Sequence, residues 1–176
     1  MIIRLKELAR KANTVHIDEV VDLTDVFKQR NDLLGFGPLH VKLQARYHDG
    51  AAEVTGELNI EAEQPCSRCL TPVKQKLDIP FHETFARAAD GSKPEDEDGY
   101  VSREDEDIHY VTDEKIELLP YVIENVVLAL PFVPLCVEDC QGLCPVCGKN
   151  RNEQACGCKQ DKTDPRLAGL ADFFKS

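Results

Sequence analysis

The sequence has no long apolar run. None of its segments approaches the roughly 18 consecutive apolar residues that a membrane-spanning helix needs. The first ten residues have neither the apolar centre nor the cleavage pattern of a secretory signal. These absences predict a soluble, cytoplasmic protein with no membrane partner. In a reducing compartment, closely spaced cysteines favour metal binding or redox chemistry over disulfides.

Positive charge is also scarce. The chain has 21 Lys and Arg residues against 32 Asp and Glu residues, a formal net charge of −11. A free-standing nucleic-acid binder clusters Lys and Arg against phosphate, so this balance argues against that class. Residues 90–107 hold nine acidic and two basic residues, whereas residues 141–176 hold four acidic and six basic ones. The acidic segment is predicted to be a mobile surface loop; the alternative is a segment that binds a partner or mimics nucleic acid.

Catalytic motifs are missing as well. The chain contains no Gly-rich phosphate loop, no Gly-x-Ser-x-Gly and no metalloprotease motif. Five histidines are present, none paired with another at ligand or relay spacing: His16, His40, His48, His82 and His109. The sequence therefore predicts a protein that is not an enzyme and has no small-molecule substrate.

What the sequence does contain is eight cysteines in four short-spaced pairs. In chain order the pairs are Cys66 and Cys69, Cys136 and Cys140, Cys144 and Cys147, and Cys156 and Cys158. Zinc binds four thiolates in a tetrahedron, commonly from two such pairs. We therefore predict two four-cysteine zinc sites, one from the first two pairs and one from the last two. The main alternative joins the first pair to the third. Full thiolate ligation leaves no open coordination position, so the metal is expected to be structural.

Other cysteine chemistry fits the spacing less well. A thioredoxin-like role for Cys66 and Cys69 requires a helix N-terminus after a parallel strand, whereas this pair lies between two antiparallel runs. Cys140, Cys144 and Cys147 have the spacing of the iron–sulfur triplet in radical S-adenosylmethionine enzymes. The chain is too short for that barrel, and each of these cysteines has a competing neighbour. A thiol or iron–sulfur redox enzyme is therefore the less favoured alternative.

Basic residues lie beside the cysteines in the sequence. A Zn²⁺ ion with four thiolates carries a net charge of −2, so nearby cations are expected. Arg68, Lys149, Arg151 and Lys159 are placed to offset that charge. The alternative is that they contact RNA phosphate.

Alternating apolar and polar residues predict three long strands. Val41–Tyr47 and Val54–Ala62 alternate cleanly, and Val73–Phe85 does so with interruptions. Asp49-Gly50 predicts a tight turn between the first two strands, and the C-x2-C pair lies at the tip between the second and third. Pro80 predicts an edge or a bulge in the third strand. Upstream, the pattern indicates a weak strand at 15–23 and a short helix at 25–34.

Helices are predicted at two further places. Apolar residues recur every three or four positions from Leu119 to Leu130, which indicates a helix that packs on the sheet and ends at Pro131. A last short helix is predicted after Asp164. The predicted fold is α+β, an antiparallel β-meander packed by helices, with a C-terminal four-cysteine zinc-knuckle lobe. The predicted domains are a core at 1–135 and a cysteine-rich lobe with the C-terminal helix at 136–176.

Four motifs occur in order from the first cysteine pair to the C-terminus: Cys66-Ser-Arg-Cys69-Leu, Leu128-Ala-Leu-Pro131, Asp139-Cys140-Gln-Gly-Leu-Cys144-Pro-Val-Cys147-Gly and Asp164-Pro-Arg166-Leu. Together they resemble the large ribosomal RNA subunit accumulation protein family (YceD-like). The resemblance implies a bacterial or plastid protein needed for normal accumulation of 23S ribosomal RNA, with no known catalytic activity. It also implies that some relatives lack the last four cysteines, which makes these an accessory lobe. Arg68 matches the arginine of the family's C-x-R-C motif.

We therefore expect a non-catalytic zinc-binding factor that supports 23S ribosomal RNA accumulation or processing, or assembly of the large ribosomal subunit. The expected partner is ribosomal RNA or a basic ribosomal or assembly protein, and the acidic balance favours the protein. Arg68, Lys149 and Arg151 are the candidate contacts to RNA or the ribosome. The alternative is a zinc-ribbon regulator that binds nucleic acid directly through Lys149, Arg151, Lys159 and Lys162.

Overall fold

The computed structural model describes residues 1–11, 14–28, 30–87, 108–112 and 115–159. The chain divides into two compact units: unit 1 is Met1–Gln64 with Lys74–Phe132, and unit 2 is Pro65–Val73 with Val133–Ser176. The predicted acidic loop and the predicted helix after Asp164 lie outside the described residues. Among the residues that are described, no helix is long and apolar enough to cross a membrane.

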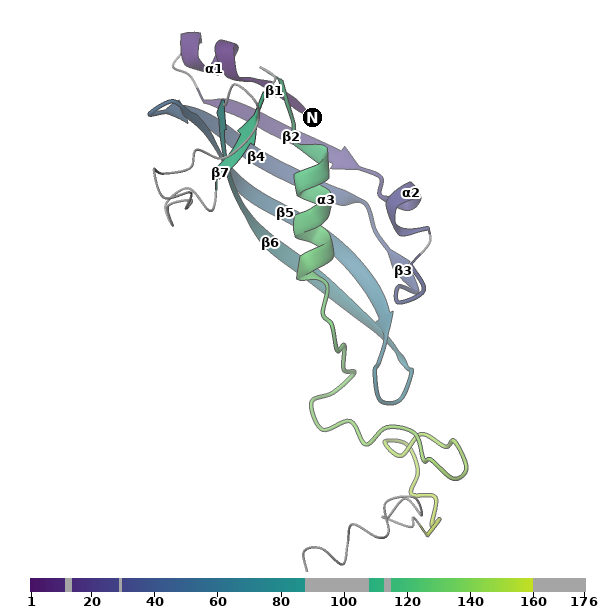
Figure 1. Ribbon diagram of the computed structural model, residues 1–176. Helices are drawn as coiled ribbons and strands as arrows, with labels where there is room; N and C mark the ends of the chain where they lie inside the picture. Colours follow the sequence, from purple (N-terminus) through teal and green to yellow (C-terminus); the bar gives the residue numbers. More distant parts are fainter. Residues whose placement is uncertain (12–13, 29, 88–107, 113–114, 160–176) are drawn as a thin grey trace, which may run out of the picture. The chain divides into compact units, whose positions relative to one another are not determined.

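Unit 1 contains nearly all of the regular structure (Figure 1). The described elements are β1 (Ile2–Arg4), α1 (Leu5–Lys11), β2 (Val15–Val21), α2 (Thr24–Phe27), β3 (Gly35–Phe36), β4 (Leu39–His48), β5 (Ala51–Pro65), β6 (Pro72–Arg87), β7 (Ile108–Val111), β8 (Lys115–Glu117) and α3 (Leu119–Ala129). The α+β prediction is confirmed. The helix predicted at 25–34 is shorter than expected, since α2 covers four residues.

The main sheet has the order β2-β4-β5-β6-β7, and β3 pairs with β5. β4 pairs with β5 in antiparallel orientation, as the predicted meander requires. The pairs β2–β4 and β3–β5 are antiparallel as well, but β7 pairs with β6 in parallel. The β6–β7 register covers only the far end of β6, from Thr84 to Arg87. Pro80, which has no backbone donor, lies outside that register. Asp49 and Gly50 have φ angles of 47° and 87°, and they make the two-residue turn between β4 and β5 as predicted.

Alternate residues of the long strands face the core. Val41, Leu43 and Ala45 of β4 are buried, while the alternating residues Lys42 and Arg46 are exposed. α3 runs across one face of the sheet (Figure 1) and buries Val122 and Val126 against it. Pro120 lies in the first turn of α3, where its missing N–H removes no helical hydrogen bond. The helix ends before Pro131, as predicted from the sequence.

Gly56 allows β4 and β5 to approach closely. A Cβ atom at this position would lie 2.8 Å from Leu43 Cα and 2.9 Å from a methyl group of the same residue. Neither distance is possible without displacement of the neighbouring strand, so this position in the middle of β5 accepts only glycine.

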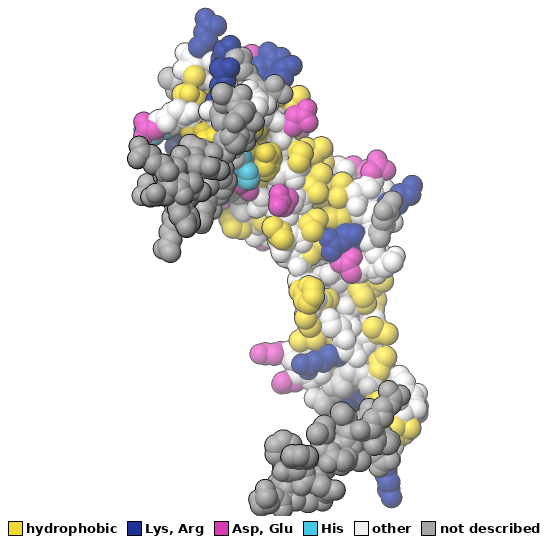
Figure 2. Space-filling model, viewed as in Figure 1, with side chains coloured by type: hydrophobic (Ala, Val, Ile, Leu, Met, Phe, Trp, Pro, Cys, Tyr) yellow, Lys and Arg dark blue, Asp and Glu magenta, His cyan; other side chains and the backbone are white. Residues whose placement is uncertain are grey.

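Polar and aromatic contacts join β7 to β6 and α3. His109 Nε2 lies 2.7 Å from Glu83 Oε2, and Asn125 Nδ2 donates to Glu83 Oε1 at 2.8 Å. The Tyr121 ring packs against both Phe85 and His109, at centroid distances of 4.9 Å and 4.6 Å, and the latter two rings lie 5.3 Å apart. At the end of unit 1 that carries α1, basic side chains gather on the surface (Figure 2), where Lys6 and Arg10 are exposed.

Candidate metal centres

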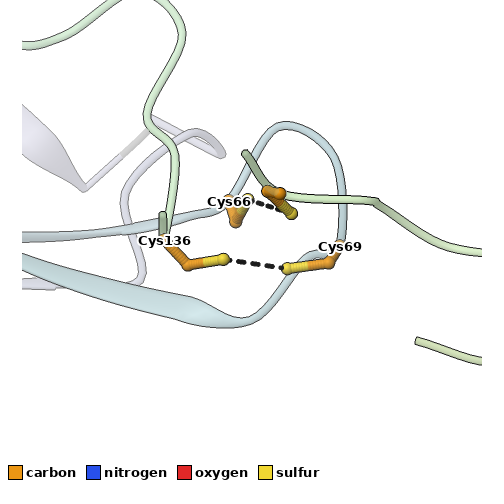
Figure 3. Close-up of side chains that lie close together, drawn as sticks. Cys66, Cys69 and Cys136 are labelled. Atoms are coloured by element: carbon orange, nitrogen blue, oxygen red, sulfur yellow. Dashed lines mark hydrogen bonds between the residues drawn. The ribbon is translucent and has the colours of Figure 1, made fainter. Parts of the chain in front are cut away.

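The first group of cysteines combines two distant parts of the chain. Cys66 and Cys69 lie in the six-residue connection between β5 and β6, and Cys136 and Cys140 lie in the segment that follows α3. The sulfur atoms of Cys66 and Cys140, 74 residues apart in sequence, are separated by 3.8 Å. Those of Cys69 and Cys136 point toward one another across 3.5 Å (Figure 3). All four sulfur atoms lie within 4.8 Å of one another, so this group has the membership predicted from the spacing.

These distances fit a tetrahedral metal site. Four sulfurs at about 2.3 Å from a central zinc form a tetrahedron whose edges are about 3.8 Å. A disulfide requires a separation of about 2.05 Å, and all eight cysteines are free. Cys66, Cys69 and Cys140 are buried and Cys136 is partly buried. A buried group of four thiols with tetrahedral spacing can hold a metal ion.

Backbone hydrogen bonds fold the connection between β5 and β6 into a knuckle. The Leu70 amide donates to the Cys66 carbonyl at 2.9 Å, and the Cys66 amide donates to the Thr71 carbonyl at 2.9 Å. The Ser67 amide donates to the Pro134 carbonyl at 2.8 Å, which holds the segment after α3 against the knuckle. These bonds lie within unit 2, and they bring the C-x2-C pair to its partners.

Hydrogen-bond donors surround the sulfur atoms of the first group. Burial would raise the pKa of the Cys66 thiol, but backbone amides, led by that of Arg68, lower it to about 6. Burial likewise opposes ionisation of Cys140, yet its pKa is lowered because the Asn152 side chain donates to the sulfur at 3.2 Å. The Cys69 thiol donates to the Thr71 hydroxyl oxygen at 3.3 Å. At Cys66 and Cys140 the environment therefore favours the thiolate, the form that binds metal.

The second group consists of the last four cysteines and lies closer to solvent. The sulfur atoms of Cys144, Cys147, Cys156 and Cys158 also lie within 4.8 Å of one another. Cys144 is buried, Cys147 is exposed, and Cys156 and Cys158 are partly buried. The amides of Cys147 and Val146 are the main reason that the pKa of Cys144 is lowered to about 6. The predicted partition of the eight thiols into two groups is thus the one that the structure contains.

The third cysteine pair forms a knuckle with the same hydrogen bonds as the first. The Gly148 amide donates to the Cys144 carbonyl at 2.8 Å, and the Cys144 amide donates to the Lys149 carbonyl at 2.8 Å. In both knuckles the first cysteine accepts from the residue four positions later and donates to the residue five positions later. The local chemistry of C-x2-C therefore produces the same turn twice.

One thiol in each group has a raised pKa. The hydrogen bond with Cys69, together with burial, raises the pKa of Cys136 to about 12. Hydrogen bonds with Cys147 and Cys156 raise the pKa of Cys158 to about 12. Four thiolates this close would repel one another strongly, so full ionisation requires a cation among them. A divalent ion bound by the four cysteines of a group would supply that charge and favour loss of the thiol protons.

The candidate contact residues lie near the sites without touching the sulfurs through their side chains. Arg68 is exposed, and its guanidinium donates to the Cys140 carbonyl at 2.9 Å, which holds the knuckle against the later segment. Lys149, Arg151 and Lys159 are exposed. Lys162 lies outside the described residues. The roles of Arg68, Lys149 and Arg151 as RNA or ribosome contacts remain predictions.

Sequence reasoning missed two residues that form hydrogen bonds with the sulfurs, Thr71 as an acceptor and Asn152 as a donor. Thr71 and Asn152 belong to none of the cysteine pairs, and their types are common in turns. No spacing rule links Asn152 to Cys140, twelve positions earlier.

The predicted boundary at 135/136 also differs from the two units, because the Cys66–Cys69 knuckle belongs with the C-terminal segment.

Comparison with known proteins adds an independent result. A family model described as "Large ribosomal RNA subunit accumulation protein YceD" matches residues 54–174, a range that includes all eight cysteines. An uncharacterized protein of Mycobacterium tuberculosis is 36% identical over 124 residues, which cover 69% of this chain and 55% of the relative. An uncharacterized protein of Mycobacterium leprae is 30% identical over 137 residues, 78% of this chain and 59% of the relative. The matches therefore span little more than half the length of these mycobacterial relatives.

A third relative matches over most of its length. The uncharacterized protein YlbN of Bacillus subtilis is 30% identical over 161 residues, 90% of this chain and 87% of the relative. No solved structure matches.

Proposed function

Because this chain belongs to the large ribosomal RNA subunit accumulation protein (YceD) family, we propose that it is a non-catalytic zinc-binding factor. Its proposed role is to support accumulation or processing of 23S ribosomal RNA, or assembly of the large ribosomal subunit. The observation that carries this proposal is the family match, which extends over both cysteine groups. The metal sites and the family function therefore lie in the same stretch of chain.

Zinc is the metal that we propose for both groups. Zinc favours tetrahedral sites with four thiolates, and such sites leave no position open for a substrate. Structural zinc suits a protein in which the metal holds two distant segments together rather than reacting. Elemental analysis of the purified protein should give two equivalents of zinc in a colourless sample. A coloured protein with iron would instead support the iron–sulfur alternative.

Loss of the protein tests the ribosomal role. In cells that lack it, we expect 23S ribosomal RNA to fall relative to 16S, together with the amount of large subunits on a sucrose gradient. A plasmid copy with Ser67→Ala should restore both, because this side chain is exposed. A copy with Cys66→Ser should fail, because it removes a buried thiol of the first group. An unchanged 23S to 16S ratio in cells without the protein would refute the proposal.

The proposed partner is a basic ribosomal or assembly protein. The formal charge of −11 supports this choice, because a surface with excess carboxylates repels phosphate and attracts Lys and Arg. Affinity purification at moderate salt, with and without ribonuclease, tests it. A protein partner that survives ribonuclease treatment is expected. Loss of every partner after ribonuclease would favour RNA as the direct ligand.

Direct binding of RNA is the second candidate function. It is favoured by the exposed positions of Lys149, Arg151 and Lys159 around the second cysteine group. Each phosphate contact contributes to a fall in affinity as salt rises, so RNA binding through these residues would be steeply salt-dependent. Charge reversal at Lys149 and Arg151 should then lower both the affinity for RNA and its salt dependence.

A cytoplasmic location remains a prediction of the sequence and agrees with the need for reduced thiols.

A further inference from the structure

Asn152 belongs in sequence to the second cysteine group but bonds to the first. It lies between Cys147 and Cys156, yet its Nδ2 donates to the sulfur of Cys140 at 3.2 Å. Cys140 is a member of the first group. One side chain thus connects the segment between two thiols of one group to a thiol of the other.

The orientation of the Asn152 amide is fixed by its other bonds. Its Oδ1 accepts from the Gln141 amide at 2.8 Å, and its Nδ2 also donates to Asn150 Oδ1 at 2.8 Å. If the amide were flipped, its nitrogen would face the Gln141 N–H, which is itself a donor. Its oxygen would then face both Asn150 Oδ1, an acceptor, and the Cys140 sulfur. The nitrogen therefore faces Cys140, and its N–H is available to stabilise a thiolate there.

The backbone around Asn152 is held against the first group as well. The Arg151 amide donates to the Gly142 carbonyl at 2.9 Å, and Leu143 forms an isolated antiparallel bridge with Asn150. The Leu143 amide in turn donates to the Arg68 carbonyl, within the first knuckle, at 3.0 Å. A short series of backbone bonds therefore runs from the segment 150–152 to the Cys66–Cys69 knuckle.

The two groups differ in their exposure to solvent. Three of the four thiols in the first group are buried, whereas in the second group only Cys144 is buried and Cys147 is exposed. A chelator or a competing metal reaches an exposed ligand more easily than a buried one. The second group is therefore the one expected to exchange its ion first.

From this geometry we infer that Asn152 couples the two metal sites. An ion in the second group anchors the segment between Cys147 and Cys156, and so holds the Asn152 amide on Cys140. Loss of that ion leaves the segment held only by the few hydrogen bonds around Asn152, which weakens its bond to Cys140 and speeds release of the ion in the first group. The inference rests on the proposal that both groups bind metal. It adds that the ion in the exposed second group controls how long the buried first group retains its own ion.

Cadmium-113 NMR of the full chain tests the role of Asn152. The wild-type protein loaded with cadmium should give two resonances, and the one that disappears in Cys147→Ser belongs to the second site. Asn152→Asp keeps the shape of the side chain but replaces the donor with a carboxylate oxygen. It should shift the first-site resonance and raise the rate of metal release from that site by about 10- to 100-fold, the usual effect of removing such a support.

Gln154→Glu is the matched control for this substitution. Gln154 is exposed in the same segment, and the change adds the same charge two positions further along the chain. It should leave both resonances and both release rates unchanged. An equal effect of Gln154→Glu and Asn152→Asp would show that charge alone is responsible, and would overturn the inference.

A double-mutant comparison tests the coupling itself. Emptying the second site with Cys147→Ser should speed metal release from the first site when Asn152 is present, and much less in the Asn152→Ala background. Equal acceleration of metal release in both backgrounds would show that the coupling runs through other contacts. No acceleration in either would show that the two sites are independent. Either result overturns the inference. Failure of the wild-type protein to bind metal at all would instead refute the proposed zinc sites.

Discussion

Leu70 and Gly148 occupy equivalent positions in the two knuckles. Each follows the second cysteine of a C-x2-C pair, and their φ angles are 60° and 71°. Glycine adopts this left-handed conformation without strain, whereas a leucine with a bulky side chain rarely does. Leu70 is 62% exposed, so burial of its side chain offsets little of that strain.

The first prediction concerns these two positions. Gly148→Ala should destabilise the metal-loaded protein by about 1 kcal/mol, because alanine is strained in the left-handed region. Leu70→Asn should not destabilise it and should raise the melting temperature slightly, because asparagine tolerates this conformation. Thermal unfolding of both variants, with zinc bound, measures the difference. A large loss of stability in Leu70→Asn would mean that the leucine side chain makes a stabilising contact.

The second prediction compares one thiol from each group. Cys66→Ser should destabilise the whole of unit 2, because the first group ties the β5–β6 connection to a segment 74 residues away. Cys144→Ser should loosen the C-terminal segment more than the Cys66–Cys69 knuckle, because all four thiols of its group lie between residues 144 and 158. Amide hydrogen exchange of the two variants distinguishes these outcomes. Equal loss of protection at residues 65–73 in both would contradict the prediction.

The third prediction concerns removal of metal from the intact protein. Unit 1 has a core of buried aliphatic and aromatic side chains, whereas the buried cluster of unit 2 consists largely of cysteines. A strong zinc chelator should therefore abolish hydrogen-exchange protection in residues 65–73 and 133–159 and leave that of β4 and β5 nearly unchanged. Addition of zinc under reducing conditions should restore the protection. Cooperative unfolding of both units on chelation would refute this division.

The fourth prediction uses the close approach at Gly56. Gly56→Ala should destabilise unit 1 by about 1–3 kcal/mol or more, because the added methyl overlaps the backbone of β4. Gly37→Ala is the control, since a Cβ there would meet Glu61 at ordinary contact distances of 3.7 Å and 3.9 Å. Urea unfolding of the two variants provides the comparison, and similar midpoints would show that the strands can separate to admit the methyl group.

The fifth prediction concerns the bonds between β6, β7 and α3. Glu83→Ala should cost about 1–3 kcal/mol, because it leaves the partly buried Asn125 amide and the His109 ring without their shared acceptor. Glu53→Ala removes a comparable His–Glu pair with His82, but at an exposed position. Its effect should be close to zero. Equal effects of the two substitutions on urea unfolding would mean that the Glu83 contacts do not hold β7 and α3 to the sheet.

Features set by neighbouring residues were predictable from the sequence. The alternation of residues 41–47 and 54–62 defined β4 and β5, since a strand with one buried face must repeat every two residues. The period of three to four from Leu119 to Leu130 defined α3 in the same way. Short spacing within each cysteine pair fixed the two knuckles, because only a tight turn brings both sulfurs to one point.

Features that depend on distant segments were decided by the tertiary structure. The parallel pairing of β7 with β6, the donor that Asn152 provides to Cys140 and the inclusion of the Cys66–Cys69 knuckle in unit 2 leave no local pattern in the sequence. Each depends on which surfaces meet once the chain has folded, and a surface made of residues from several segments has no fixed spacing. The sequence by itself therefore determined the turns, the strands and the pairs of thiols. The packing of segments far apart along the chain decided which other groups each thiol meets.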